Sequence, residues 1–171
     1  MGEIGFRRLR EDDLPLLHAW FQREHVRRWW KERSEYDEVV AHYRPSIVGD
    51  DPTELYLILL DDAPVGFVQT YLVDDYDDYA ALLGVGDGVA GVDLLIGEPD
   101  LVGKGVGSAA IDAFVERIVF ARQDTLACIA DPDARNTASL RAFEKAGFRA
   151  VREFVDPEDG ERHVLVRRDR T

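Results

Sequence analysis

The stretch Leu101-Val102-Gly103-Lys104-Gly105-Val106-Gly107-Ser108 decides the fold, because it places three glycines between an apolar run and a long amphipathic segment. Glycine adopts positive φ and lets a ligand approach the main chain without interference from a Cβ atom. A loop that feeds a helix N-terminus also presents N–H groups and the positive end of the helix dipole. The stretch therefore predicts an anion site suited to a pyrophosphate, with a glycine-rich turn that binds nothing as the alternative.

Two other phosphate-binding motifs fit this loop poorly. A P-loop requires Lys followed by Ser or Thr, whereas Lys104 is followed by Gly105. A dinucleotide-binding fingerprint lies in the first βα unit, with an acidic residue at the end of the next strand. Here the loop comes late, and Asp131 lies only a little beyond the following strand. Both motifs are therefore disfavoured.

Strands and helices alternate on both sides of the loop. Alternating or β-branched apolar runs predict strands, and apolar residues at helical spacing predict helices. The pattern is that of an α/β or α+β fold, a mixed sheet with helices packed on it. The expected strands are 4–9, 55–60, 65–72, 89–96, 125–130, 148–155 and 163–166; the expected helices are 14–21, 35–43, 107–121 and 137–146, with a hairpin at 61–64, an acidic loop at 74–79 and a turn at 156–160.

Length and composition predict a single globular domain over residues 1–171, with 46% apolar and 32% charged residues. The apolar runs are too short to cross a bilayer, and the first residues lack the pattern of a signal peptide. Cys128 is the one cysteine and cannot form an internal disulfide. We therefore expect a cytoplasmic protein with no membrane partner, a monomer or weak homodimer.

The charge balance is strongly acidic. Thirty-four acidic residues against 21 basic ones give a formal net charge of −13. Nucleic-acid binding depends on Lys and Arg neutralising phosphates, so no nucleic-acid partner is expected. A small polycationic partner is compatible with this field, although solubility alone also explains an acidic surface.

The glycine loop and the segment from Asn136 through Arg141-Ala142-Phe143-Glu144-Lys145-Ala146-Gly147-Phe148 resemble the acetyl-CoA core of GNAT acetyltransferases. The resemblance implies a mixed sheet of six or seven strands splayed around an acetyl-CoA cleft, with helices on both faces. It also implies that loop N–H groups hold the pyrophosphate, and that main-chain groups of the preceding strand hold the pantetheine and polarise the thioester carbonyl. The implied cofactor-binding residues are Leu94, Leu95, Ile96, Val102, Gly103, Lys104, Gly105, Val106, Gly107, Ser108, Asn136 and Phe143.

A finer resemblance, over residues 4–166, is to the aminoglycoside 6′-N-acetyltransferases. The order and spacing of several short pieces carry it. This resemblance implies acetyl transfer from acetyl-CoA to a primary amine of an aminoglycoside, at the 6′ position. The pieces are His25-Val26-Arg27-Arg28-Trp29-Trp30, Tyr43-Arg44-Pro45-Ser46, Pro64-Val65-Gly66-Phe67-Val68-Gln69-Thr70-Tyr71, Gly91-Val92-Asp93 and Asp131-Pro132.

Three aspartates match or extend the family's acidic site. Asp93 matches the active-site aspartate, which would hold the substrate ammonium and accept its proton. Asp131 matches a second aspartate, with an Asp-Pro turn as the alternative. Asp159 could add a third substrate contact, although turn chemistry explains an Asp-Gly pair equally well.

Aromatic and polar side chains are expected to complete the substrate site. One of Trp29 and Trp30 would form a wall that stacks on a sugar ring, and the other would belong to the core. Gln69 and Tyr71 alternate with apolar neighbours along a strand and so could face the cleft. The resemblance adds Tyr43 to this set.

Two positions depart from the family pattern. Phe143 stands where many GNAT enzymes carry a tyrosine that protonates the leaving thiolate, so water, Tyr71 or Tyr79 would have to serve, or no acid at all. Val102 stands where Gln or Arg is frequent, a change that main-chain contacts tolerate.

Two other functions stay open. One is a GNAT enzyme acting on a siderophore precursor or a protein N-terminus; siderophore acylases tend to place a histidine where this chain has Gly91. The other is a non-catalytic acyl-CoA-binding protein, which stays open because Phe143 cannot donate a proton. Cys128 is interpreted as a small core residue, and His18, His25, His42 and His163 show no metal-ligand spacing, so no metal is expected.

Overall fold

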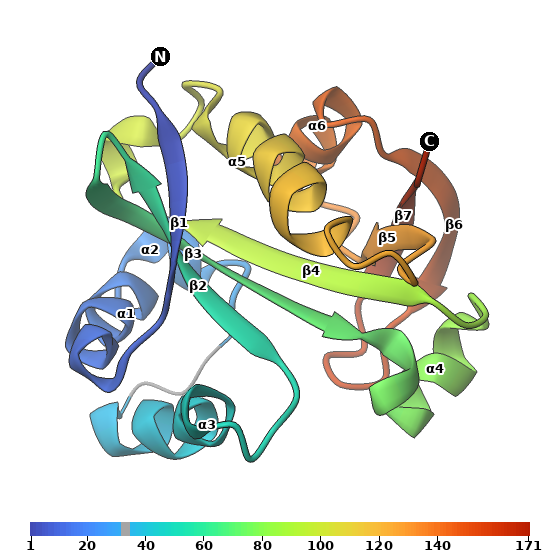
Figure 1. The fold of residues 1–171 in the computed structure, drawn as a ribbon, viewed down its shortest axis with the longest axis horizontal. Helices are drawn as coiled ribbons and strands as arrows, with labels where there is room; N and C mark the ends of the chain where they lie inside the picture. The colour runs from blue at the N-terminus through green and yellow to red at the C-terminus, as the bar shows by residue number, and fades with distance from the viewer. Residues whose placement is uncertain (32–34) are drawn as a thin grey trace. The chain divides into compact units, whose positions relative to one another are not determined.

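The computed structural model describes residues 1–31 and 35–171, which form seven strands and six α-helices (Figure 1). The sheet is open and mixed, in the order β1-β2-β3-β4-β5-β7-β6, with β4 and β5 parallel. The predicted α/β fold class is therefore confirmed. The strands are β1 (Ile4–Arg8), β2 (Glu54–Leu60), β3 (Ala63–Leu72), β4 (Val89–Ile96), β5 (Ala127–Ala130), β6 (Arg149–Val155) and β7 (Arg162–Asp169). The helices are α1 (Leu14–Phe21), α2 (Glu24–Arg27), α3 (Tyr36–Val48), α4 (Asp77–Leu83), α5 (Val106–Phe114) and α6 (Thr137–Lys145).

The chain divides into two compact units. The first contains residues 1–69 and 94–106, and the second contains residues 70–93 and 107–171. The division falls within β3 and within β4, so each unit contains part of both strands. A single domain over the whole chain stays a prediction.

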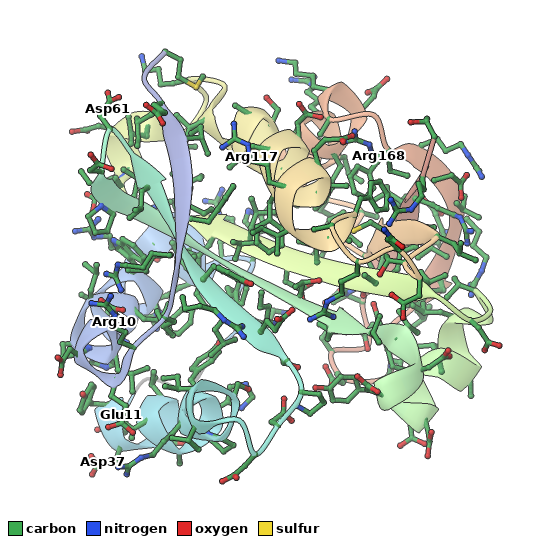
Figure 2. All side chains as sticks on the ribbon, viewed as in Figure 1. Arg10, Glu11, Asp37, Asp61, Arg117 and Arg168 are labelled. Carbon is green, nitrogen blue, oxygen red and sulfur yellow. The ribbon has the colours of Figure 1, made fainter. Side chains whose placement is uncertain are left out.

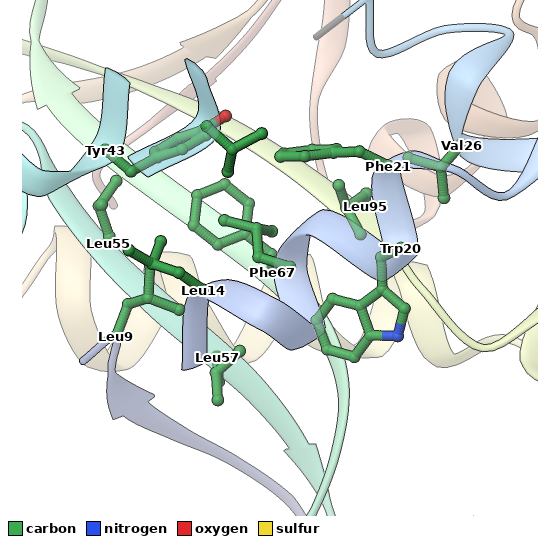
Figure 3. Packing of buried hydrophobic residues seen from close by; sticks show 12 residues of the cluster. Leu9, Leu14, Trp20, Phe21, Val26, Tyr43, Leu55, Leu57, Phe67 and Leu95 are labelled. Atoms are coloured by element: carbon green, nitrogen blue, oxygen red, sulfur yellow. The ribbon is translucent and has the colours of Figure 1, made fainter. Parts of the chain in front are cut away.

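The first unit is built on a core of aromatic and leucine side chains (Figure 3). Trp20, Tyr43 and Phe67 come from α1, α3 and β3, and each exposes at most 2% of its surface. Fully burying a side chain of this size contributes roughly 1.5–3 kcal/mol before conformational entropy is counted. This packing holds α1 and α3 against the strands of the first unit.

The second unit has its own smaller core around β5 and β7, to which the 3-10 turn Val73–Asp75, α4 and the strands contribute. Polar contacts of Arg168 on β7 lie beside this core (Figure 2). Its guanidinium pairs with Asp112 at 2.9 Å and with Glu116, and donates to the carbonyl of Ala146 at 2.9 Å. The buried members of the cluster are Val73, Leu83, Val89, Ala127, Ile129 and Leu165.

The prediction that the helix beginning at residue 35 stops before Pro45 is wrong. α3 continues to Val48 with Pro45 inside it, and ends at Gly49 in the left-handed conformation, φ 88°. Proline removes one helical donor, but its carbonyl still accepts from the N–H groups of Asp50 at 2.8 Å and Asp51 at 3.1 Å. Glycine at the C-terminus therefore ends this helix, and proline does not.

Two further segments differ from the sequence prediction. The acidic stretch 74–79, predicted to be a loop, contains the start of α4, whose first-turn residues Asp77 and Asp78 complement the helix dipole. Buried Leu83 anchors that helix. The helix predicted over 107–121 is interrupted, since α5 ends at Phe114 and passes into one π turn over Val115–Val119.

Acidic side chains lie on the outside of the described parts of the chain. Glu11, Asp37 and Asp61 are exposed examples (Figure 2). Within the described residues, no helix has both the length and the apolar character that crossing a membrane requires.

Candidate active site

β4 carries Asp93, the predicted base, at a point where the pairing of β4 with β5 has already ended. The described register joins Val89 to Ala127, Ala90 to Cys128 and Gly91 to Ile129, and stops there. Asp93 is half-buried, two residues beyond the last pair. An end to pairing in the middle of a strand leaves the main chain beyond it able to bind a ligand. This fits the splayed strand expected for acetyl-CoA binding.

Tyr71 on β3 lies directly against Gly91. A Cβ atom on Gly91 would lie 2.4 Å from the Tyr71 ring, so only glycine fits at position 91 beside this tyrosine. The neighbouring Thr70 hydroxyl donates to the carbonyl of Gly91 at 2.9 Å and fixes the two strands locally. Burial, followed by the charge of Asp93, raises the pKa of Tyr71 well above its ordinary value. Tyr71 is therefore a neutral phenol near the Asp93 carboxylate at neutral pH.

Tyr79, on α4, links Tyr71 to the second predicted aspartate. The rings of Tyr71 and Tyr79 lie edge to face, with centroids 6.0 Å apart. The Tyr79 hydroxyl donates to Oδ1 of Asp131 at 2.9 Å. Burial, and then the charge of Asp131, raises the pKa of Tyr79 far above its ordinary value. Asp131 is thus brought into the same group as Tyr71, although 60 residues separate them in the sequence.

His163 on β7 is a member of this group that the sequence analysis missed. Its Nδ1 donates to the main-chain carbonyl of Asp131 at 2.6 Å, and its Nε2 lies 2.8 Å from Oδ2 of Asp159. The side chains of His163 and Asp131 expose only 12% and 13% of their surface. Hydrogen bonding to Asp131, against the opposing effect of burial, and then to Asp159 raises the pKa of His163 to about 10.

Carboxylates surround His163 in two overlapping sets of three potential metal ligands. One set is Asp131, Asp156 and His163, and the other is Asp133, Asp159 and His163; in each, the ligand atoms lie within 4.8 Å of one another. Both ring nitrogens of His163 already face oxygen atoms at hydrogen-bonding distance. A protonated imidazole donates at both nitrogens, so the imidazolium places a positive charge among these carboxylates.

Asp159, predicted as a third substrate contact, is engaged on both carboxylate oxygens. Oδ1 accepts from the N–H of Glu161 at 2.8 Å, and Oδ2 faces His163. Its first contact is the local turn that the sequence analysis gave as the alternative. The structure thus brings together Tyr71, Asp131 and Asp159 of the predicted substrate residues.

The predicted aromatic residues of the first unit separate into core and partly exposed positions. Trp30 packs against the core, with ring centroids 6.0 Å from Phe21 and 5.7 Å from Phe67. Tyr43 is 2% exposed and packs among the same rings, and its contact with a substrate stays a prediction. Trp29 and Gln69 are half-buried, and Trp29 is the better candidate for the substrate wall.

The glycine loop has the backbone geometry that the sequence predicted. Gly103 and Gly105 adopt φ of 76° and 83°, which disfavours any residue with a Cβ atom at either position. Val102 and Lys104 are exposed, and α5 begins directly after the loop at buried Val106. Such a loop fits the pyrophosphate of a nucleotide cofactor.

Residues near the end of β4 carry further contacts that the sequence analysis did not identify. His25 Nε2 donates to the carbonyl of Ile96 at 2.9 Å, and Arg23 donates to the carbonyl of Gly97 at 2.7 Å. Arg23 also pairs with Glu98 at 3.0 Å. These contacts fix α2 onto the strand that leads into the loop. They border an open surface depression of about 630 Å³, lined by Arg23, Glu24, His25, Arg28, Glu98, Pro99 and Asp100.

Asn136 and Phe143, predicted to contact the cofactor, have structural partners in α6. The Asn136 side chain accepts from the N–H of Ser139 at 3.2 Å and caps the helix. Phe143 is 3% exposed and packs edge-on against Phe148, with ring centroids 5.0 Å apart. Cys128 is fully buried, which raises the pKa of its thiol and fits the predicted core role. Contacts of Asn136 and Phe143 with a cofactor stay predictions.

Comparisons with protein families, with curated proteins and with solved structures all match this chain to acetyltransferases. The family described as acetyltransferase (GNAT) domain matches residues 10–156. The aminoglycoside N(6′)-acetyltransferase type 1 of Klebsiella pneumoniae is 30% identical over 157 residues, covering 85% of this chain and 73% of that protein. The solved structure of AAC(6′)-Ib with paromomycin and acetyl-CoA superposes with a TM-score of 0.84 at 28% identity, over 98% of this chain and 94% of that one. A structure of the same enzyme with coenzyme A and kanamycin has a TM-score of 0.83 at 28% identity, over 98% and 95% of the two chains.

Proposed function

Because this chain belongs to the GNAT acetyltransferase family, an acetyl-CoA-dependent class of enzymes, we propose that it acetylates a primary amine of an aminoglycoside, at the 6′ position. The observation that carries the proposal is the acidic and phenolic group around Asp93, Tyr71 and Asp131 in a chain whose relatives are aminoglycoside N(6′)-acetyltransferases. Carboxylates of this kind suit an ammonium substrate.

Asp93 acts as the ammonium anchor and base. An aminoglycoside amine is mostly protonated near neutral pH and cannot attack until it loses a proton. The Asp93 carboxylate accepts that proton, directly or through one water molecule. The amine nitrogen then forms a bond to the thioester carbonyl carbon, the C–S bond breaks, and the sulfur leaves with the bonding electron pair. The second proton that the nitrogen loses as it becomes an amide passes to the thiolate, directly or through water.

The residues that follow Asp93 in β4 hold acetyl-CoA. Main-chain groups of Leu94, Leu95 and Ile96 bind the pantetheine and polarise the thioester carbonyl, which stabilises the negative charge that develops on its oxygen. The carbonyl of Ile96 already accepts from His25, so the contribution of Ile96 comes through its N–H. The glycine loop holds the pyrophosphate with main-chain N–H groups at the start of α5.

The leaving thiolate needs no dedicated acid. The ordinary pKa of a thiol is about 8.5, so a thiolate is a tolerable leaving group near neutral pH. Phe143 has no proton to give and is buried. Tyr71 is a neutral phenol near Asp93, but its raised pKa makes it a weaker acid than an ordinary tyrosine and so a poor proton donor to the thiolate.

The two competing functions have less support. A histidine at position 91, which siderophore acylases tend to carry, would occupy the space of the Tyr71 ring. A non-catalytic acyl-CoA-binding protein has no ammonium substrate, so carboxylates gathered around buried phenols would have no ligand to bind.

Product analysis tests the proposed regiochemistry. The purified protein is incubated with acetyl-CoA and kanamycin, and the product is examined by mass spectrometry and two-dimensional NMR. We expect a single acetyl group on the 6′ nitrogen. Acetylation of another nitrogen would overturn the position, and an acetylated hydroxylamine made in preference to kanamycin would favour the siderophore alternative.

A further inference from the structure

The Asp131 carboxylate is held from two sides by side chains that are far away in the sequence. On one side the Tyr79 hydroxyl donates to Oδ1 at 2.9 Å. On the other side His163 Nδ1 lies 3.4 Å from Oδ2 while it donates to the main-chain carbonyl of the same residue. The hydrogen bond from Tyr79 fixes one carboxylate oxygen and the ion-pair contact with His163 restrains the other, so few rotamers are left to Asp131 before a ligand arrives.

His163 is itself held in place by residues of β6 and of the turn that follows it. Nε2 faces Asp159 at 2.8 Å and Asp156 at 3.8 Å. Its ring lies 5.8 Å from that of Phe154, centroid to centroid. Asp133, the remaining carboxylate nearby, pairs with Arg135 at 2.8 Å, and that contact lowers the pKa of Asp133 to about 2.

The main chain completes this arrangement. His163 forms an isolated β-bridge with Asp133, and the N–H of Val164 donates to the carbonyl of Pro132 at 3.0 Å. The segment after β5 and the start of β7 are therefore joined on both sides of the imidazole. Any movement of His163 would move Asp131 with it.

We infer that His163 and Tyr79 are positioning residues, which orient Asp131 toward an ammonium group of the amine substrate. The inference rests on the proposed function and extends it to two residues that do not themselves touch the substrate. Their removal weakens the binding of the amine and leaves the acetyl-transfer step and acetyl-CoA binding intact.

Steady-state kinetics with ribostamycin and acetyl-CoA test the inference in the full-length protein. We expect Tyr79→Phe and His163→Gln to raise the KM for the amine about tenfold, the lower end of the effect of one hydrogen bond to a charged group. The KM for acetyl-CoA and kcat should change less than about twofold by the same reasoning. Arg162→Gln is the matched control, because it removes a cation from the same strand whose partner, Glu153, lies outside the cluster.

Repeating both substitutions in an Asp131→Asn variant tests directly whether Tyr79 and His163 act through Asp131. If Tyr79 and His163 act through Asp131, their substitutions add less than about twofold to the amine KM once that carboxylate is gone. Full effects in the Asp131→Asn background would overturn the inference. A lower amine KM in His163→Gln would also overturn it, because it would show that the imidazolium competes with the substrate ammonium.

A second measurement does not depend on turnover. The ¹⁵N chemical shifts of the His163 ring should be those of an imidazolium at pH 8 in the wild-type protein and should change in Asp131→Asn. A neutral ring at pH 8 would contradict the arrangement itself. Absence of amine-dependent turnover with an imidazolium present would instead contradict the proposed function, so the two failures are distinguishable.

Discussion

His163 links the chemistry of single side chains to the stability of the protein. Its pKa is raised from about 6.5 in an unfolded chain to about 10 in the folded state, chiefly by hydrogen bonding to Asp131. A group whose pKa rises on folding stabilises the folded state when it is protonated. This contribution is complete below about pH 6.5 and is lost as the pH rises through about 10.

Comparison of wild type with His163→Gln across pH tests that linkage. The difference in free energy of unfolding should be largest at pH 6, shrink steadily above it, and reach a small constant value above pH 10, as measured by urea denaturation. Arg162→Gln should show no such slope, because its guanidinium stays charged throughout. A difference that is independent of pH would contradict the raised pKa of His163.

Sequence reasoning at the residue scale could reach Asp93, Asp131 and Asp159 through the resemblance to a known family. It could not reach the role of His163, and it named Tyr79 only as a possible proton donor, not as a partner of Asp131. Hydrogen bonds join Asp131 to partners 32 and 52 residues away, and no local pattern encodes such a distance. A histidine in a strand gives no signal until the fold places it among carboxylates.

At the scale of elements, the glycine loop between the 3-10 turn Pro99–Leu101 and α5 depends on backbone conformations that a side chain disfavours. Gly103 has φ 76°, with nothing within 4 Å of where a Cβ atom would lie, so an alanine there meets strain but no clash. Strain of this kind costs on the order of 1 kcal/mol. The loop is expected to relax away from the shape that we propose binds the pyrophosphate.

Gly103→Ala should therefore raise the KM for acetyl-CoA about tenfold, since a shifted loop loses more than one main-chain hydrogen bond to phosphate. Gly49→Ala is the matched control, because Gly49 has φ 88° and equally open surroundings at the end of α3. Thermal unfolding should show similar losses for both variants. An unchanged acetyl-CoA KM in Gly103→Ala would contradict the assignment of the loop.

Most elements could be predicted from periodicity and turn residues, and the differences have local causes. Val89–Ile96 is the strand that the pattern predicted. α3 continues through Pro45 because the capping contacts at Gly49 stabilise the helix by more than the one hydrogen-bond donor that proline removes. α4 is stabilised by the burial of Leu83. Periodicity records apolar spacing and does not weigh such tertiary contacts.

At the scale of the whole molecule, a net charge of −13 favours a polycationic amine over an anionic cofactor. Salt screens charges that lie more than a Debye length apart, about 10 Å at 0.1 M ionic strength. The long-range part of amine binding should therefore weaken as salt increases, while repulsion of acetyl-CoA is relieved.

Kinetics at rising ionic strength test this effect of the overall charge. Between roughly 0.05 and 0.5 M NaCl, the KM for kanamycin should rise several-fold and the KM for acetyl-CoA should stay level or fall. Sucrose in place of salt controls for viscosity and solvent effects. A kanamycin KM that does not respond to salt would show that the overall field plays no part in substrate capture.

The most direct test of the central claim is thiol release from acetyl-CoA by the purified protein, with and without kanamycin, for wild type and Asp93→Asn. We predict kanamycin-dependent release by the wild type, and a kcat lower by about 100-fold or more in Asp93→Asn, the contribution typical of a general base. Acetyl-CoA binding, followed by calorimetry, should be retained in that variant. No kanamycin-dependent release by a wild-type protein that binds acetyl-CoA, or equal release by Asp93→Asn, would contradict the account.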